Sequence, residues 1–227
     1  MKLQAQNISK RFFRQNRNSN YFYAVQPCDF DLEEGALTVI MGRSGSGKTT
    51  FMSLLAGLLP PDSGGVFAEG KNLYTMKDKA LSAFRAAHLA VVPQGRAALD
   101  TLSVWENVML NARILRRENE ETAGKAKELL DRFGMTPLKD ARPRELSGGE
   151  LRRMTLCRAL VTEPEILFCD EPTGDLDEEN TRLVLETLRD YAHAGHSVLL
   201  VTHEPEAAAY ADRLLKMKEG LPEASDP

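Results

Sequence analysis

Short apolar runs recur along the chain and are separated by longer segments in which apolar and polar positions follow a helical spacing. Four continuous apolar runs are typical of strands that are buried on both faces of a sheet. They span residues 36–41, 89–94, 166–171 and 197–203. Helical spacing follows the first run, in residues 49–59, and separates the last two, in residues 181–195. This alternation predicts a parallel sheet with right-handed crossovers.

The segment between residues 95 and 150 has a different pattern, because its spacing is mostly helical. Within it, residues 121–134 place four apolar side chains on one helical face and Gly134 at the C-terminal cap. These side chains are Ala126, Leu129, Leu130 and Phe133. We therefore expect a helical insert between two parts of one α/β core.

Polar stretches divide the N-terminal part of the chain. Residues 2–8 and 28–32 are typical of short strands, and they lie on either side of the polar stretch RQNRNSN (14–20), which we interpret as a loop. PPDSGG (60–65) predicts a turn.

Length and composition are those of an ordinary globular protein. The 227 residues suit one domain, with an α/β core at 1–94 and 150–221 and a helical subdomain at about 95–149. Hydrophobic residues make up 42% of the chain and charged residues 27%. The formal net charge of -4 gives no support for a binder that depends on bulk positive charge, so we expect no nucleic-acid partner.

The N-terminal sequence MKLQAQNISKRFF lacks the apolar centre of a signal peptide. No apolar run approaches the roughly 18–20 residues that are needed to span a bilayer. We therefore expect a cytoplasmic protein; if it works at a membrane, another subunit provides the span. The three cysteines, Cys28, Cys157 and Cys169, have no metal-binding spacing, and we interpret them as small buried side chains in a reducing compartment.

GRSGSGKT (42–49) matches the phosphate-loop pattern G-x-x-x-x-G-K-[ST] between a predicted strand and a predicted helix. Glycines let backbone N–H groups turn toward phosphates, and the helix N-terminus adds a favourable dipole. Lys48 is expected to reach the β- and γ-phosphates, and Thr49 to hold Mg²⁺ through its hydroxyl. A structural glycine-rich turn is the alternative. The residues expected to contact the nucleotide are Gly42, Arg43, Ser44, Gly45, Ser46, Gly47, Lys48, Thr49 and Thr50.

Polar side chains stand at the ends of three of the apolar runs. Ligands bind at the carboxyl ends of the strands of parallel sheets, so these side chains are candidates for catalysis. Asp170 is expected to bind Mg²⁺, and Glu171 to polarise the attacking water. His203 would contact the γ-phosphate or orient the water, and Gln94 would reach Mg²⁺ or the water. The alternatives are a solvated turn for the acidic pair and a structural role for the histidine.

LSGGE (146–150) is a second candidate anion site. Two glycines and a serine open a predicted helix, so free N–H groups, a hydroxyl and a helix dipole are available to an anion. Taken alone, the pattern is also explained by Ser147 as an ordinary N-cap. The chain thus contains two candidate phosphate loops.

The order of these motifs resembles that of the nucleotide-binding subunit of ABC transporters. The family's motifs are Walker A (42–49), the Q-loop glutamine Gln94, the signature LSGGE, Walker B ILFCDE, the D-loop GDLD (174–177) and the H-loop histidine His203. The resemblance implies an α/β fold, namely a P-loop NTPase (RecA-like) core with a mostly parallel sheet, an N-terminal antiparallel β subdomain and a helical subdomain insert. It also implies a Mg²⁺-dependent ATPase with ATP and Mg²⁺ as cofactors.

In that family two subunits pack head to tail, and ATP lies between Walker A of one subunit and the signature of the other. The resemblance therefore implies a homodimer in which Ser147 and Gly149 close on the γ-phosphate that the partner's Lys48 holds. Residues assigned to this contact by the resemblance are Ser147, Gly148, Gly149, Glu150 and Asp175. The family also has an aromatic side chain upstream of Walker A that stacks on adenine. NISKRF places Phe12 there, with Phe13, Tyr21 and Tyr23 as rivals and an ordinary core aromatic as the alternative.

EPTGDLD and the segment after Gln94 are similar to those of lipoprotein-releasing (Lol-type), macrolide-exporter (MacB-type) and FtsX-partner cassettes. This resemblance implies a motor on the inner face of the cell membrane that drives export, extraction or transmembrane mechanical signalling. A MacB/FtsX-like permease would dock at the groove between the Q-loop and the helical subdomain. Asp175 replaces the asparagine usual in the D-loop, and Gly95 and Arg96 replace a serine and a bulky aromatic in the docking segment.

Other functions remain as alternatives. The cassette could act mainly as a signalling partner that controls an external hydrolase, or it could drive an importer. A DNA-repair or translation cassette is disfavoured, because the chain has neither a long coiled-coil insert nor a second cassette. A GTPase is disfavoured because no NKxD motif follows the phosphate loop.

Overall fold

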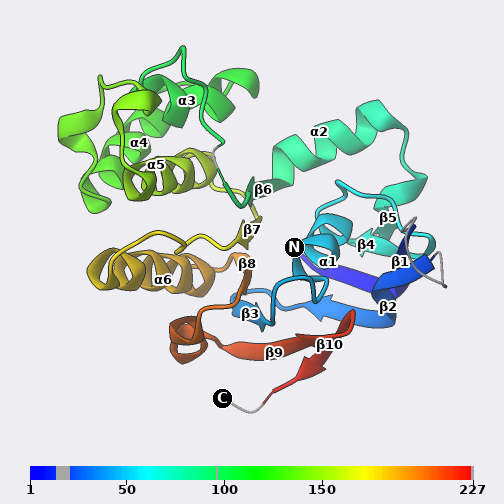
Figure 1. The fold of residues 1–227 in the computed structure, drawn as a ribbon. Helices are drawn as coiled ribbons and strands as arrows, with labels where there is room; N and C mark the ends of the chain where they lie inside the picture. Colours follow the sequence, from blue (N-terminus) through cyan, green and yellow to red (C-terminus); the bar gives the residue numbers. More distant parts are fainter. Residues whose placement is uncertain (14–20, 96, 226–227) are drawn as a thin grey trace.

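Two sheets and six α-helices make up the part of the chain that this computed structural model describes, namely residues 1–13, 21–95 and 97–225 (Figure 1). The loop expected at 14–20 and the replacement at Arg96 lie outside the described residues.

Within the described residues, the larger sheet has six strands in the order β10-β9-β3-β8-β7-β6. Their bounds are β3 (Leu37–Met41), β6 (Leu89–Val92), β7 (Ile166–Asp170), β8 (Ser197–Thr202), β9 (Arg213–Lys218) and β10 (Leu221–Ala224). All neighbours are parallel except β10, which pairs antiparallel with β9. The parallel sheet predicted from the four apolar runs is confirmed, and its carboxyl edge gathers the ends of β3, β6, β7 and β8.

The smaller sheet has four described strands in the order β2-β1-β4-β5, and all of its neighbours are antiparallel. Their bounds are β1 (Leu3–Phe13), β2 (Tyr21–Leu32), β4 (Ser63–Ala68) and β5 (Lys71–Asn72). This sheet confirms the expected N-terminal antiparallel β subdomain. Its first two strands are longer than the predicted ranges 2–8 and 28–32, because they continue into a partly exposed ribbon at residues 9–13 and 21–27. The turn expected at 60–65 is also too long, since β4 begins at Ser63.

The helices are α1 (Lys48–Leu55), α2 (Asp78–His88), α3 (Val104–Ile114), α4 (Glu120–Arg132), α5 (Gly148–Leu160) and α6 (Glu178–His193), with 3₁₀ turns η1 (Leu73–Thr75), η2 (Thr136–Leu138), η3 (Pro143–Glu145) and η4 (Pro205–Tyr210). Figure 1 shows α3, α4 and α5 grouped beside the sheets. Because α5 packs against α3 and α4, we propose that the helical subdomain extends to about Leu160 rather than ending at 149. Within the described part of the chain, no helix is both long and apolar enough to cross a membrane.

The core consists of two apolar clusters, one on each face of the larger sheet. Leu167 and Cys169 of β7 face the cluster that includes the helical subdomain, whereas Phe168 faces the cluster around α1 and the smaller sheet. Strands that are buried on both faces explain the continuous apolar runs. Cys157 and Cys169 are fully buried, as expected, whereas Cys28 is only partly buried, and burial raises the pKa of its thiol to about 11.

Candidate functional site

The phosphate loop joins β3 to α1. Its last glycine is needed for two reasons: its backbone has a positive φ, and there is no room for a Cβ. Gly47 is the N-cap of α1 and has a φ of 107°. A Cβ added there would lie 2.1 Å from the carbonyl oxygen of Ala24, in β2. An alanine at this position would therefore be strained and would also clash with the smaller sheet.

The loop is braced by a turn from the far end of the chain. Gly220, between β9 and β10, donates its N–H to the carbonyl of Ser46 at 3.1 Å. Gln26 donates its backbone N–H to the carbonyl of Gly220 at 2.9 Å. The turn thus links β2 to the phosphate loop, a contact that the sequence pattern did not indicate.

Lys48 is buried at the start of α1, and its ammonium is folded over the loop. Its Nζ donates to the carbonyl oxygens of Gly42 at 2.7 Å and of Arg43 at 3.3 Å. The same nitrogen lies 3.8 Å from Oε1 of Glu171. The ammonium is therefore held at the mouth of the loop by acceptors that a phosphate could replace.

Thr49 and Asp170 form a pair that could hold a hard divalent cation. The Thr49 hydroxyl donates to Oδ2 of Asp170 at 2.8 Å. The other oxygen, Oδ1, is buried and has no hydrogen-bond partner among the described residues. Burial raises the pKa of Asp170, as expected for a carboxylate that lacks a sufficient counter-charge. A hydroxyl and an under-satisfied carboxylate fit the oxygen ligands that Mg²⁺ prefers.

Glu171 and His203 are hydrogen-bonded across the ends of β7 and β8. Oε1 of Glu171 lies 2.9 Å from Nδ1 of His203, and this hydrogen bond raises the pKa of His203. The backbone N–H of His203 donates to Oε2 of Glu171 at 3.3 Å. The Glu171 side chain is only 9% exposed, whereas that of His203 is 65% exposed. The carboxylate is thus held in the floor of the site, and the imidazole stands at its rim.

A cavity of about 340 Å³ brings most of the predicted residues together. Its lining consists of Phe12, Phe22, Ala24, Ser44, Gly45, Gly47, Lys48, Thr49, Thr50, Gln94, Glu171 and His203. Gly42, Arg43, Ser46 and Asp170 lie beside it in the loop and at the end of β7. The side chains of Phe22 and Ala24 were missed by the sequence analysis. They share one face of β2, and their period-two spacing is the only signal that could have found them.

The β1–β2 register distinguishes Phe12 from its rivals. Phe12 pairs with Phe22, and their ring centroids are 6.2 Å apart. Phe13 and Tyr21 pair with each other one position further along, so they face the opposite side of the ribbon. Neither these two rings nor Tyr23 lines the cavity, although all three are described. Phe12 is 39% exposed and is therefore not an ordinary core aromatic.

The signature residues lie elsewhere. Ser147 is the N-cap of α5, where its hydroxyl accepts from the N–H of Glu150 at 3.3 Å. The Glu150 carboxylate in turn accepts from the N–H of Ser147 at 2.7 Å, which completes a capping box. The N-cap interpretation is thus observed. Residues 146–150 are all described, and none of them lines the cavity at the phosphate loop.

Asp175 lies against the signature and not against the phosphate loop. A Cβ added to Gly148 would lie 3.9 Å from Cβ of Asp175, and one added to Gly149 would lie 3.1 Å from Leu176. Asp175 has a φ of 66°, a left-handed conformation that Asp tolerates as Asn does. The D-loop and the signature therefore form one surface, which is separate from the phosphate-loop cavity.

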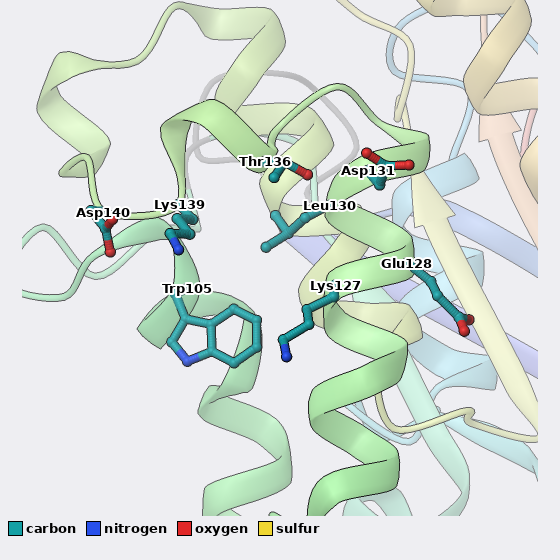
Figure 2. A pocket seen from close by; sticks show the side chains of 8 residues that line it. All are labelled: Trp105, Lys127, Glu128, Leu130, Asp131, Thr136, Lys139 and Asp140. Atoms are coloured by element: carbon teal, nitrogen blue, oxygen red, sulfur yellow. The ribbon is translucent and has the colours of Figure 1, made fainter.

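A larger cavity, of about 680 Å³, lies on the helical subdomain (Figure 2). It is lined by Trp105, Lys127, Glu128, Leu130, Asp131, Thr136, Lys139 and Asp140. Its charged side chains are exposed and of mixed sign, and none of its residues belongs to a motif identified above. We assign it no role in nucleotide binding.

Comparisons with known proteins agree with this geometry. The family model described as ABC transporter matches residues 25–174. The lipoprotein-releasing system ATP-binding protein LolD of Chromohalobacter salexigens is 37% identical, over 85% of this chain and 81% of its own length. The probable export ATP-binding/permease protein MacB of Pseudomonas entomophila is 35% identical, over 94% of this chain but only 32% of its own length. A solved dimeric ATP-binding cassette in a post-hydrolysis state, bound to ADP and Pi, superposes with a TM-score of 0.88 and 27% identity, over 99% of this chain and 97% of that one.

Proposed function

This chain belongs to the ABC transporter family, and we propose that it is the motor subunit of a membrane transporter that works as a head-to-tail homodimer. It is an ATP-binding and ATP-hydrolysing cassette related to exporter cassettes. The observation that carries the proposal is the separation of the phosphate-loop cavity from the signature within one chain. Each chain then has two half-sites, and two chains would make two complete sites.

In the proposed dimer, ATP bound at one phosphate loop meets the start of α5 from the second copy. Ser147 and the backbone N–H groups of Gly148 and Gly149 would close on the γ-phosphate, because a helix N-terminus favours negative charge. Asp175 packs beside these glycines, so its carboxylate would lie at the same contact. A related cassette has been solved as a dimer bound to ADP and Pi, which supports this arrangement.

Within one chain, the cavity residues would divide the work of nucleotide binding. Phe12 and Phe22 offer a face for adenine, and the loop N–H groups from Ser44 to Thr50 surround the phosphates. The Lys48 ammonium would exchange the carbonyl oxygens of Gly42 and Arg43 for phosphate oxygens. Thr49 and Asp170, with Gln94 nearby, would hold Mg²⁺. This ion would neutralise phosphate charge in the transition state.

For hydrolysis, we propose Glu171 as the general base. Its carboxylate lies in the floor of the cavity and is hydrogen-bonded to His203, so it can accept a proton from a water molecule placed between it and the γ-phosphate. His203, at the rim, would orient that water or contact the γ-phosphate.

The membrane partner would dock in a groove between the α/β core and the helical subdomain. The groove has a volume of about 230 Å³ and lies among the ends of α1 and α3, helix α2 and strand β6. Leu58 and Ile114 line it and are 53% and 69% exposed, so both present apolar surface that a partner would cover. We propose that one helix of a permease, with an apolar face, covers them at the inner face of the cell membrane.

Trapping the dimer tests the two-copy site. Glu171→Gln should keep ATP binding, lower turnover by about 10²–10⁴ and give an ATP-dependent dimer in size-exclusion chromatography with light scattering. The double variant Glu171→Gln, Ser147→Arg should bind ATP and stay monomeric. A dimer from the double variant would contradict the proposed contact, and normal turnover of Glu171→Gln would contradict the assigned base.

Membrane binding tests the groove. The protein should sediment with membrane vesicles that contain its permease, and Leu58→Asp should abolish this binding while its ATP affinity stays unchanged. Phe13→Asp is the matched control, because Phe13 is an exposed apolar residue on the smaller sheet, away from the groove. If both variants bind the vesicles equally well, the groove is not the docking site.

A further inference from the structure

The end of β8 places a threonine beside the proposed catalytic base. Strands β7 and β8 are parallel, and Asp170 pairs with Val201 in their register. The N–H of Glu171 continues the ladder by donating to the carbonyl of Val201 at 2.9 Å. The next residue on β8 is Thr202, whose side chain therefore lies at the level of Glu171.

Thr202 is completely buried and is hydrogen-bonded on both sides of its hydroxyl. Its Oγ1 donates to Oε2 of Glu171 at 2.8 Å. The same oxygen accepts from the backbone N–H of Glu204 at 3.1 Å. Because a backbone N–H can only donate, the hydroxyl hydrogen is left for the carboxylate. The direction of this hydrogen bond is thus fixed by the fold.

The two oxygens of Glu171 have different surroundings. Oε2 is held by the Thr202 hydroxyl and the N–H of His203. Oε1 faces Nδ1 of His203 and the Lys48 ammonium, which both line the cavity. One oxygen is therefore fixed to the end of β8, and the other is presented to the space where a nucleotide would bind.

We propose that Thr202 is a positioning residue for Glu171, whose Oε2 it holds so that Oε1 meets the attacking water. This inference rests on the proposed role of Glu171 as the base. Glu171 has a φ of 48°, in the left-handed region that residues with a Cβ adopt less often. The hydroxyl of Thr202 holds its side chain from the neighbouring strand.

Glu204, whose backbone N–H donates to the Thr202 hydroxyl, is itself held in place. The Thr173 hydroxyl, which is buried, donates to the Glu204 carboxylate. Glu204 is thus tied to the segment between Glu171 and Asp175, and its N–H is held against Thr202. The chain of hydrogen bonds leads from Thr173, the residue before the D-loop, through Glu204 and Thr202 to the Glu171 carboxylate.

Isosteric substitution separates this role from simple packing. Thr202→Val keeps the shape and β-branching but removes the donor, so we expect kcat to fall about ten- to hundredfold while KM for ATP stays within about twofold of the native value. Thr202→Ser keeps the donor and should restore at least about half of kcat. If Thr202→Val does not fold, Thr202→Cys, whose thiol is a weak donor, should show the same fall in kcat.

Thr38→Val is the matched control. Thr38 is also a fully buried threonine of the larger sheet, on the neighbouring strand β3, and its hydroxyl has no hydrogen-bond partner among the described residues. This change should leave kcat and KM unaltered. A similar loss of kcat in Thr38→Val would mean that any buried hydroxyl of this sheet matters, and would overturn the proposal.

The double variant with Glu171→Gln gives the decisive measurement. If Thr202 acts through Glu171, Thr202→Val should not lower single-turnover hydrolysis further in the Glu171→Gln background. A further tenfold loss there, or a native kcat for Thr202→Val alone, would overturn the inference. Normal turnover of Glu171→Gln alone would instead refute the proposed base, so the two failures are distinguishable.

Discussion

The hydroxyl of Thr49 donates to Oδ2 of Asp170 at 2.8 Å, so the two side chains proposed to hold Mg²⁺ are hydrogen-bonded to each other. The contact joins α1 to the end of β7, which are far apart in sequence. It keeps both groups at one edge of the cavity while Oδ1 of Asp170 remains without a hydrogen bond among the described residues. Binding of a cation would satisfy that oxygen and relieve the unfavourable burial of the carboxylate.

Asp170→Asn should therefore weaken Mg²⁺ binding without unfolding the site. The amide oxygen can still accept from Thr49, but the negative charge is lost. We expect the Mg²⁺ concentration that supports half-maximal ATP binding to rise by about tenfold or more, as measured by fluorescence titration. Glu171→Gln removes the neighbouring charge and should leave this concentration unchanged. An unchanged value for Asp170→Asn would exclude Asp170 as a ligand.

Phe12→Ala should weaken nucleotide binding. Stacking of a base on an aromatic side chain is worth about 1–3 kcal/mol, so the Kd for ATP should rise by about tenfold, measured by calorimetry. Phe13→Ala is the control, because Phe13 faces the other side of the ribbon and packs against Tyr21 with ring centroids 5.4 Å apart. If Phe13→Ala weakens binding more than Phe12→Ala, the adenine site has been placed on the wrong face.

The parts of the fold and the positions of the candidate site residues that could be predicted depend on local sequence. The phosphate loop is one contiguous motif between a strand and a helix, and the rule for parallel sheets places Gln94, Asp170 and His203 at one edge. These inferences needed no knowledge of which strands pair. The parallel sheet followed in the same way, because strands buried on both faces give continuous apolar runs.

The features that escaped prediction depend on contacts between distant segments. Phe22 reaches the cavity only through the antiparallel register of β1 with β2, and Gly220 reaches Ser46 only because β9 and β10 join the far edge of the larger sheet. In the sequence, Thr202 is only the last residue of a buried strand, and no pattern there indicates its contact with Glu171. The proposed extension of the helical subdomain to about Leu160 also depends on such contacts, because α5 packs against α3 and α4.

His203 should titrate at a higher pH than an ordinary histidine in the nucleotide-free protein. The hydrogen bond to Glu171, and then its negative charge, raise the pKa of His203 above 6.5. A raised pKa in the folded state means that this pair stabilises the fold fully below about pH 6.5, and that the contribution is lost as the pH rises through the raised pKa. The imidazole is largely exposed, so the effect on stability is small.

The measurement is an NMR titration of the imidazole protons, with the His203 signal assigned by its absence in His203→Gln. Glu171→Gln should lower the pKa of His203, because the neutral amide lacks the charge that favours imidazolium. If the pKa is the same in both proteins, the hydrogen bond between the two side chains does not persist in solution.

Gly47→Ala should destabilise the protein more than any strain in its backbone can explain. Positive φ for a residue with a Cβ costs about 1–3 kcal/mol, and Gly195 provides the comparison, since its φ is 100° and nothing lies within 4 Å of an added Cβ. Gly195→Ala should therefore lower the free energy of unfolding in urea by only this amount.

Gly47→Ala has the same backbone strain and in addition places its Cβ 2.1 Å from the carbonyl oxygen of Ala24. The smaller sheet or the phosphate loop must move, so ATP binding should be lost as well. Equal destabilisation in the two variants, with ATP binding retained in Gly47→Ala, would show that Ala24 and the loop are not in contact.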